Sequence, residues 1–207
     1  MSQTGTIHEE EHHHDYFGAK LGMWLFLLTE VLLFSGLFLA YSYLRSIYPV
    51  EFHHAGSDMN AFIGVTNTFV LLTSSLTMAL GIAAIQRGRR RMALLCVCTT
   101  ILLGLVFLMD KAIEWTEEIR RGLYPSSAHL ATLPLGEQTF FGLYYTMTGL
   151  HGLHVLAGVS VLSLMAVLLA RGRINQERFV LLENSGLYWH LVDVIWIFLL
   201  PLFYLAA

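Results

Sequence analysis

Two pairs of polar side chains inside long apolar runs have the residue types and spacing that could do chemistry. His151 and His154 lie three residues apart in the stretch 148–158, and His190 and Asp193 have the same spacing in the stretch 188–196. Residues three apart share one face of an α-helix. Because ionisable groups are costly in hydrocarbon and mark functional sites there, each pair is a candidate ligand, relay or packing site.

The residues alone leave several chemical interpretations of these pairs open. Imidazoles from two facing helices can ligate a haem iron. A series of ionisable groups, here the three histidines with Glu30 and Asp193, can relay protons through a membrane. Asp193 can also fix the tautomer of His190 or support it as a metal ligand. The remaining interpretation is that the groups bond one helix to another.

The composition places these residues in a membrane protein. Of the 207 residues, 56% are hydrophobic and 13% are charged, whereas soluble domains carry about 25% charged residues. The net charge of −3 indicates no particular partner, and we expect no nucleic acid among them. Cys96 and Cys98 point to different helix faces, so neither a disulfide nor a shared metal site is expected. No nucleotide-binding loop, nucleophile elbow or zinc cluster is recognisable.

Five apolar runs are long enough to cross a bilayer, which requires about 20 residues. They predict helices over residues 21–43, 62–85, 92–115, 140–170 and 180–205, separated by segments rich in Gly, Pro and Arg. The fold class is therefore all-α, an integral membrane bundle of five transmembrane helices that comprises residues 20–207. Residues 1–19, which are acidic and rich in histidine, are expected to form a disordered cytoplasmic tail, although such a tract can bind metal.

The distribution of Lys and Arg predicts the orientation. Eight basic residues lie in the tail and in the second and fourth connections: Lys20, Arg87, Arg89, Arg90, Arg91, Arg171, Arg173 and Arg178. The opposite side holds Arg45, Arg120 and Arg121. Because basic residues favour the cytoplasmic side, we expect the N-terminus to be cytoplasmic and the C-terminus outside.

Further polar side chains lie inside the predicted helices. Glu30 has no basic residue within two turns, so it is either protonated or bonded to another helix. Asn67 belongs to a helix of small and hydroxyl residues, which indicates burial among other helices. Lys111 and Glu114 can pair across one turn, and we expect them to anchor the outer bilayer boundary beside Trp115.

Small residues in the stretch 148–158 predict where helices approach closely. Thr148 and Gly152 are four residues apart, and such pairs favour tight contact between membrane helices. Together with the histidines they suggest a narrow, polar seam along one helix.

These stretches resemble subunit III of the haem-copper terminal oxidases, the cytochrome c oxidase and quinol oxidase family, in its short five-helix bacterial form. The resemblance covers residues 20–205. It is carried by Lys20-Leu21-Gly22-Met23-Trp24-Leu25-Phe26-Leu27-Leu28-Thr29-Glu30-Val31, by Asn67-Thr68 to Ser74-Ser75, by Lys111 to Glu114, and by the stretches 148–158 and 188–196.

The resemblance implies a multi-pass subunit of the bacterial inner membrane with no catalytic residue, no metal ligand and no redox centre of its own. Haem and copper would lie in the partner subunits, which are subunit I, subunit II and small subunits. The chain would stabilise subunit I, bind phospholipid and support proton uptake during oxygen reduction. Residues expected at a lipid-binding or proton-related site are Lys20, Phe26, Glu30 and His151. Those expected in a buried polar layer and in subunit packing are Asn67, Lys111, Glu114, His154, His190 and Asp193.

The sequence departs from the longer members of the family in one respect, which affects the expected lipid site. Longer members have two additional helices before these five, and their lipid cleft lies between the two groups. In this protein a neighbouring subunit would have to form the other side of that cleft. A subunit III-like partner of a nitric oxide reductase and an independent proton or ion transporter are alternatives, although transporters often contain internal repeats and this sequence has none. The resemblance leaves both cytochrome c and quinol open as electron donors.

Overall fold

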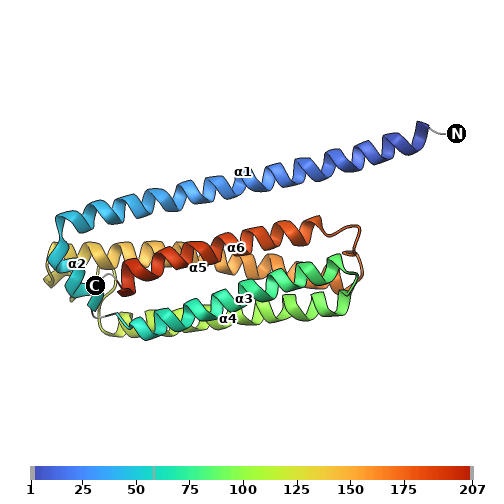
Figure 1. The fold of residues 1–207 in the computed structure, drawn as a ribbon. Coiled ribbons are helices and arrows are strands. Elements are labelled where there is room, and N and C mark those ends of the chain that lie inside the picture. Colours follow the sequence, from blue (N-terminus) through green and yellow to red (C-terminus); the bar gives the residue numbers. More distant parts are fainter. Residues whose placement is uncertain (1–2, 58, 206–207) are drawn as a thin grey trace.

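The structure is a computed structural model that describes residues 3–57 and 59–205, with side chains from Gly18 onward. Within these residues the chain forms helices and no strands. Four long helices lie side by side, α1 lies along one side of them, and the short α2 caps one end (Figure 1). The helices are α1 (Gln3–Ile47), α2 (Pro49–Ser57), α3 (Ala61–Gln86), α4 (Arg90–Arg120), α5 (Leu135–Ala170) and α6 (Val180–Leu200), with a 3-10 turn η1 (Leu130–Thr132) and a π-helical turn η2 (Pro201–Leu205).

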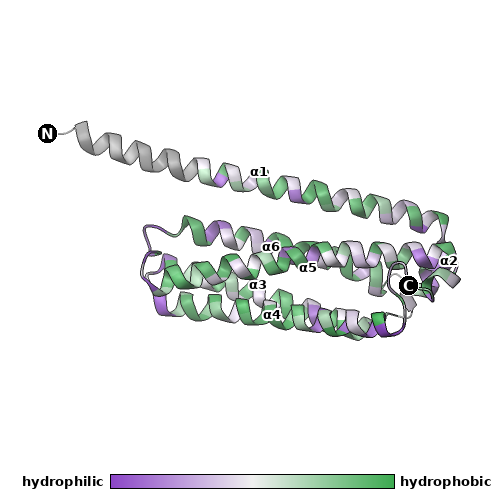
Figure 2. Cartoon of the chain, turned by 180° about the vertical axis from the view of Figure 1, so that it is seen from behind, coloured by the Kyte–Doolittle hydropathy of each residue, from purple (hydrophilic) through white to green (hydrophobic). Residues whose placement is uncertain are grey.

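Five segments of these helices are long and apolar enough to cross a membrane. They are Gly18–Ile47, Ala61–Gln86, Arg90–Arg120, Leu135–Ala170 and Val180–Leu205. Apolar residues predominate along the helices, and hydrophilic residues gather at the connections (Figure 2). The prediction of an all-α bundle with five transmembrane helices is confirmed, whereas the orientation of the termini stays a prediction.

Helix α1 extends back to Gln3, so the segment expected to be a disordered tail continues the first helix. The side chains of residues 1–17, including the tail histidines, lie outside the described residues. The division into a tail of residues 1–19 and a membrane domain of residues 20–207, and the possible metal binding by the tail, therefore stay predictions.

Helix α2 is an element that the hydropathy pattern does not predict. It begins at Pro49, a residue favoured at the first helical position because it has no N–H to leave unpaired. Phe52 of α2 is buried, and its ring packs edge-on against Tyr41 at 5.4 Å and Phe140 at 5.5 Å between centroids. The segment folds because these aromatic contacts cover it.

Two buried tryptophans of α6 organise the centre of the bundle. The indole N–H of Trp189 donates to Ser74 Oγ at 2.9 Å, and that of Trp196 donates to Thr68 Oγ1 at 3.0 Å. Both tryptophans are fully buried. The hydroxyl-rich helix α3 thus satisfies the polar atom of each indole, which agrees with its predicted burial among other helices.

Glycines make room for Trp189 on two neighbouring helices. A Cβ added to Gly104 of α4 would lie 2.6 Å from Trp189 Cη2, and one added to Gly158 of α5 would lie 2.9 Å from Trp189 Cε3 and Cζ3. By contrast, a Cβ on Gly152 would meet no atom within 4 Å. The expectation of a close approach at Thr148 and Gly152 is therefore wrong within this chain, because the tight contact lies at Gly158, where the indole is seated.

We predict that Gly158→Ala lowers the free energy of unfolding by about 1–3 kcal/mol relative to Gly152→Ala, because the added methyl group overpacks the Trp189 site. Both variants gain the same helix propensity, so the comparison isolates the packing effect. Thermal unfolding of the two variants in the same detergent measures the difference. Equal melting temperatures would show that the indole can move aside without cost.

Candidate functional site

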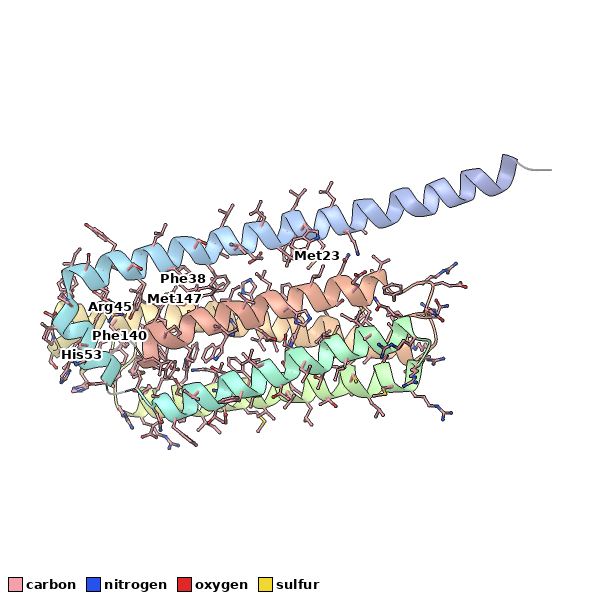
Figure 3. All side chains as sticks on the ribbon, viewed as in Figure 1. Met23, Phe38, Arg45, His53, Phe140 and Met147 are labelled. Carbon is pink, nitrogen blue, oxygen red and sulfur yellow. The ribbon has the colours of Figure 1, made fainter. Side chains whose placement is uncertain are left out.

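The predicted polar residues form an interhelical pair at Glu30, an ion-pair centre at Lys111, and several separate buried groups. They lie on the faces where the helices pack against one another. Helix α1 meets α5 and α6 mainly through apolar side chains, with Phe38 and Met147 among those near this boundary (Figure 3). Its outer face carries exposed Leu25, Leu28 and Leu32.

Glu30 of α1 is bonded to His154 of α5. The distance from His154 Nε2 to Glu30 Oε2 is 2.8 Å, and both side chains are about one-sixth exposed, at 16% and 15%. His154 Nδ1 lies 2.8 Å from the carbonyl oxygen of Leu150. Of the two states expected for an isolated carboxylate, the structure therefore contains a bond to another helix.

These contacts limit the proton arrangements of the pair. The Leu150 carbonyl only accepts, so the contact at Nδ1 is a hydrogen bond in the tautomer that carries a proton there. A hydrogen bond between Nε2 and Oε2 then requires one more proton between them. The pair is therefore a carboxylic acid beside a neutral imidazole, or a carboxylate beside an imidazolium. Its net charge is zero in both forms, which is the cheaper state in hydrocarbon.

Other contacts fasten the same face of α1. Phe26 packs on Tyr188 of α6 with ring centroids 6.0 Å apart, and the Tyr188 hydroxyl donates to the His154 carbonyl at 3.1 Å. Nearer the start of the span, Lys20 Nζ lies 3.1 Å from Glu183 Oε1. Lys20, Phe26 and Glu30 thus each contact a residue of α5 or α6.

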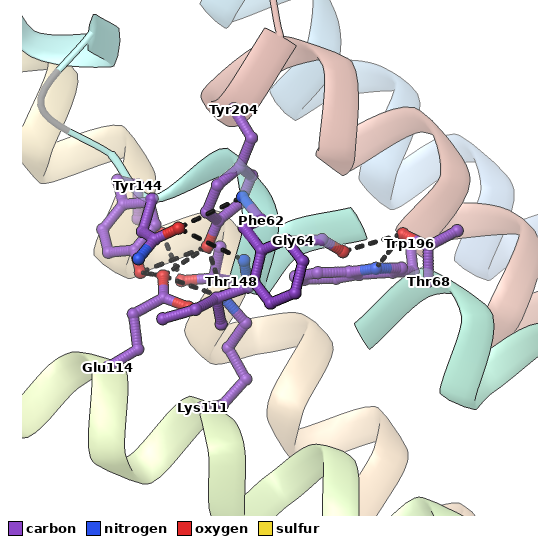
Figure 4. Close-up of polar contacts among 11 residues, drawn as sticks. Phe62, Gly64, Thr68, Lys111, Glu114, Tyr144, Thr148, Trp196 and Tyr204 are labelled. Atoms are coloured by element: carbon purple, nitrogen blue, oxygen red, sulfur yellow. Dashed lines mark hydrogen bonds and ion pairs between the residues drawn. The ribbon is translucent and has the colours of Figure 1, made fainter. Parts of the chain in front are cut away.

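The second group is a buried ion pair on α4. Lys111 Nζ lies 3.0 and 2.9 Å from the two carboxylate oxygens of Glu114, and it also donates to the Tyr204 hydroxyl. Glu114 accepts further hydrogen bonds from the hydroxyls of Tyr144 and Tyr204 (Figure 4). Both charged residues are only 7% exposed. We refer to Lys111, Glu114, Tyr144 and Tyr204 as the Lys111 cluster.

Aromatic rings complete the environment of the ammonium group. Lys111 Nζ lies 4.7 Å from the centroid of the Trp196 ring and 4.9 Å from that of Tyr204. Cation–π attraction of this kind is strongest where water is excluded. The predicted pairing of Lys111 with Glu114 is confirmed. Residues from α5 and η2 enclose the pair inside the bundle, and its expected place at the bilayer boundary stays a prediction.

Tyr144 and Tyr204 are site residues that the sequence analysis did not identify. They lie 60 residues apart in the chain, with their hydroxyl oxygens 3.5 Å apart in the structure. Tyrosine is common at membrane boundaries, so its type alone gave no reason to place either hydroxyl on Glu114. Only the packing of α5 and η2 on α4 brings them together.

His151 and Asn67 are fully buried and lack hydrogen-bond partners among the described residues. The His151 ring lies edge-on to Phe107 at 5.6 Å and 5.3 Å from the ring of Trp196. These placements agree with a buried polar layer. The proton-related role predicted for His151 stays a prediction.

His190 and Asp193 do not pair with each other. His190 Nδ1 lies 2.5 Å from Ser75 Oγ, and the buried carboxylate of Asp193 faces the same Ser75 side chain. Ser75 of α3 therefore lies between the two groups. The predicted direct contact by which Asp193 would orient His190 is not formed.

The three intramembrane histidines do not converge. His154 is bonded to α1, His190 to α3, and His151 lies among aromatic rings. In the part of the chain that the structure describes, no three His, Cys, Asp or Glu side chains are grouped as metal ligands would be. This geometry does not favour the interpretation of these residues as haem ligands. The absence of a redox centre from this chain stays a prediction.

We predict that Lys111→Met lowers the free energy of unfolding by about 3–5 kcal/mol, because it leaves the Glu114 carboxylate buried without its counter-charge. Lys111→Met combined with Glu114→Leu should recover most of that loss, since no buried charge remains. Chemical unfolding in detergent measures both variants.

Arg120→Gln is the control for this prediction. Arg120 is exposed at the end of the same helix, where a surface substitution changes the free energy of unfolding by about 0.5 kcal/mol or less. A loss for Lys111→Met no larger than that for Arg120→Gln would contradict the role given to the Lys111 cluster.

Comparison with known proteins gives consistent matches over the whole chain. The family model described as cytochrome c oxidase subunit III matches residues 1–207. The chain is 32% identical to cytochrome c oxidase subunit 3 of Thermostichus vulcanus, over 100% of this chain and 97% of that protein. It is 31% identical to cytochrome bo(3) ubiquinol oxidase subunit 3 of Pseudomonas aeruginosa, over 97% of this chain and 91% of that protein. It is 29% identical to cytochrome c oxidase subunit 3 of Emericella nidulans, over 88% of this chain and 65% of that protein.

Proposed function

The chain belongs to the cytochrome c oxidase subunit III family, and we propose that it is the non-catalytic subunit of a proton-pumping haem-copper terminal oxidase. In this role it stabilises subunit I, binds phospholipid and supports proton uptake. As an oxidase subunit III it is a multi-pass membrane protein that belongs to a complex with other subunits. We further propose the bacterial inner membrane as its location, and subunit I, subunit II and small subunits as its partners.

The Glu30–His154 pair is the observation that most strongly supports the finer proposal. A hydrogen bond of 2.8 Å places one proton between the two side chains. The pair also links α1, whose outer face is apolar and exposed, to α5. A proton-holding group beside a lipid-facing helix is suited to a site where lipid occupancy and proton supply are connected.

The arrangement along α1 supports the phospholipid part of the proposal. Lys20 and Glu183 lie near the start of the span, where a headgroup would sit, and Phe26 lies one and a half turns deeper. Phe26 is 44% exposed, so it can contact an acyl chain while it packs on Tyr188. The large exposed apolar residues of α1 extend this surface: Leu21, Trp24, Leu25, Leu28, Val31, Leu32, Leu33 and Leu39.

The composition of the purified complex tests the main proposal. The chain is extracted from its native membranes in mild detergent, and the accompanying chains are identified by mass spectrometry together with their haem and copper content. We expect a large subunit that contains haem and copper to accompany it. Isolation of the chain alone, with ion transport in liposomes or a haem spectrum of its own, would refute the proposal. If the chain is isolated together with a nitric oxide reductase, it is a partner of that enzyme and the proposal of an oxidase subunit is wrong.

We predict that Glu30→Gln preserves assembly and haem content but shortens the active lifetime of the oxidase several-fold. The glutamine amide can still donate to His154 Nε2, so the link between α1 and α5 remains while the shared proton is lost. Oxygen consumption followed over many turnovers measures the lifetime, and bound phosphate per haem measures lipid retention.

Glu30→Leu is the matched comparison, because it removes the hydrogen bond as well as the proton. We expect it to weaken the attachment of α1 in addition to shortening the lifetime. If Glu30→Gln itself releases the chain from the complex, Glu30 is a packing contact and the proton-related role is refuted. If Glu30→Gln has the lifetime and lipid content of the wild type, that role is also refuted.

A further inference from the structure

A hollow lined by arginines lies where the turn between α3 and α4 meets the end of α5. It has a volume of about 720 Å³ and is lined by residues 88–92, Leu94 and Ala170. The connections α3–α4 and α5–α6 lie at the same end of the bundle (Figure 1). The proposed function does not use this region, which lies on helices other than the one that carries Lys20, Phe26 and Glu30.

One arginine holds the hollow in shape. Arg90 Nε donates to the Leu169 carbonyl at 2.6 Å, and its Nη2 donates to the Ala170 carbonyl. It therefore binds two carbonyls at the end of α5, of which that of Leu169 also accepts from the backbone N–H of Gly172. These bonds hold the backbone around Arg90 in place. The neighbouring residues Arg89 and Arg91 therefore keep a defined position in the lining of the hollow.

Arg89 and Arg91 are exposed, and within the described residues no ion pair involves either of them. The two connections at this end are strongly cationic. Segments 87–91 and 171–178 contain seven arginines and a single carboxylate: Arg87, Arg89, Arg90, Arg91, Arg171, Arg173 and Arg178, with Glu177. An anion that enters the hollow thus meets unpaired guanidinium groups and little repulsion.

The surface changes from cationic to apolar within one helical turn of the arginines. Met92 is 51% exposed and Leu95 is 69% exposed, and both lie on one face of α4 directly inside the span that begins at Arg90. A soluble anion would use only the arginines. A molecule with an anionic head and an apolar tail uses both surfaces at once.

We propose that this hollow binds the headgroup of an anionic phospholipid. The phosphate lies between Arg89 and Arg91, whose planar guanidinium groups can each donate two parallel hydrogen bonds to it. An acyl chain runs along Met92 and Leu95 on α4. Basic pockets at the ends of membrane helices recognise anionic headgroups by this combination of charge and depth.

Lipid retention by the purified complex tests this site. The complex is reconstituted in nanodiscs that contain phosphatidylglycerol and phosphatidylcholine, extracted in detergent, and analysed for bound lipid by mass spectrometry. We expect Arg89→Gln with Arg91→Gln to retain about tenfold less phosphatidylglycerol than the wild type, because two charges near the headgroup are lost. Retention of phosphatidylcholine should be unchanged.

Two further variants make the result specific. Arg89→Lys with Arg91→Lys keeps the charge and should retain most of the phosphatidylglycerol. Arg120→Gln with Arg121→Gln removes the same charge from the opposite end of α4 and should have no effect on this lipid. Equal losses in the two glutamine double variants would refute the site, as would wild-type retention by Arg89→Gln with Arg91→Gln.

The subunit content of the same samples separates this inference from the proposed function. Loss of an accompanying subunit with unchanged phosphatidylglycerol would show that Arg89 and Arg91 contact protein, and would overturn the lipid site. Subunit content that matches the wild type, together with unchanged lipid, refutes the lipid site and leaves membership of the oxidase complex intact.

Discussion

A lysine and a glutamate can remain charged inside this bundle only because three other helical segments supply their surroundings. In a hydrocarbon environment, every polar group must find its partner within the protein. The Lys111 ammonium meets this requirement through Glu114, the Tyr204 hydroxyl and the ring of Trp196, and the Tyr144 hydroxyl satisfies Glu114. Helices α4, α5, α6 and the turn η2 must therefore keep one relative arrangement, since a shift of any of them removes a hydrogen bond or a ring contact from the buried ion pair.

Helix α1 is attached by different means. Its links to the bundle include the Glu30–His154 pair, the Lys20–Glu183 ion pair and ring contacts such as that of Phe26 with Tyr188. The polar side chains of these links are about 15–30% exposed, whereas Lys111 and Glu114 are less than 10% exposed. The molecule thus combines a deeply buried polar centre at the Lys111 cluster with a first helix that is held by more exposed contacts, on the side where its apolar residues are exposed.

Features carried by many neighbouring residues could be predicted from the sequence, and features that depend on packing could not. The prediction of each of the five spans rests on the hydropathy of about 20 residues, so a single polar residue such as Glu30 does not change it. Helix α2 was missed because its nine residues fold on Tyr41 and Phe140, which belong to other helices. The pairing of Lys111 with Glu114 follows from local spacing, whereas the hydroxyls of Tyr144 and Tyr204 arrive from distant parts of the chain.

The chain distance between Lys111 and Tyr204 also bears on how the protein is made. The two residues are 93 positions apart, so α4 enters the membrane well before the hydroxyl that contacts its lysine has been synthesised. Before α6 and η2 are inserted, the Lys111 ammonium can pair with Glu114, one turn away on the same helix. Once α5 has inserted, it can also contact the ring of Tyr144. The short spacing between Lys111 and Glu114 thus gives the newly inserted helix a charge-neutral form of its own, and the aromatic enclosure is added later.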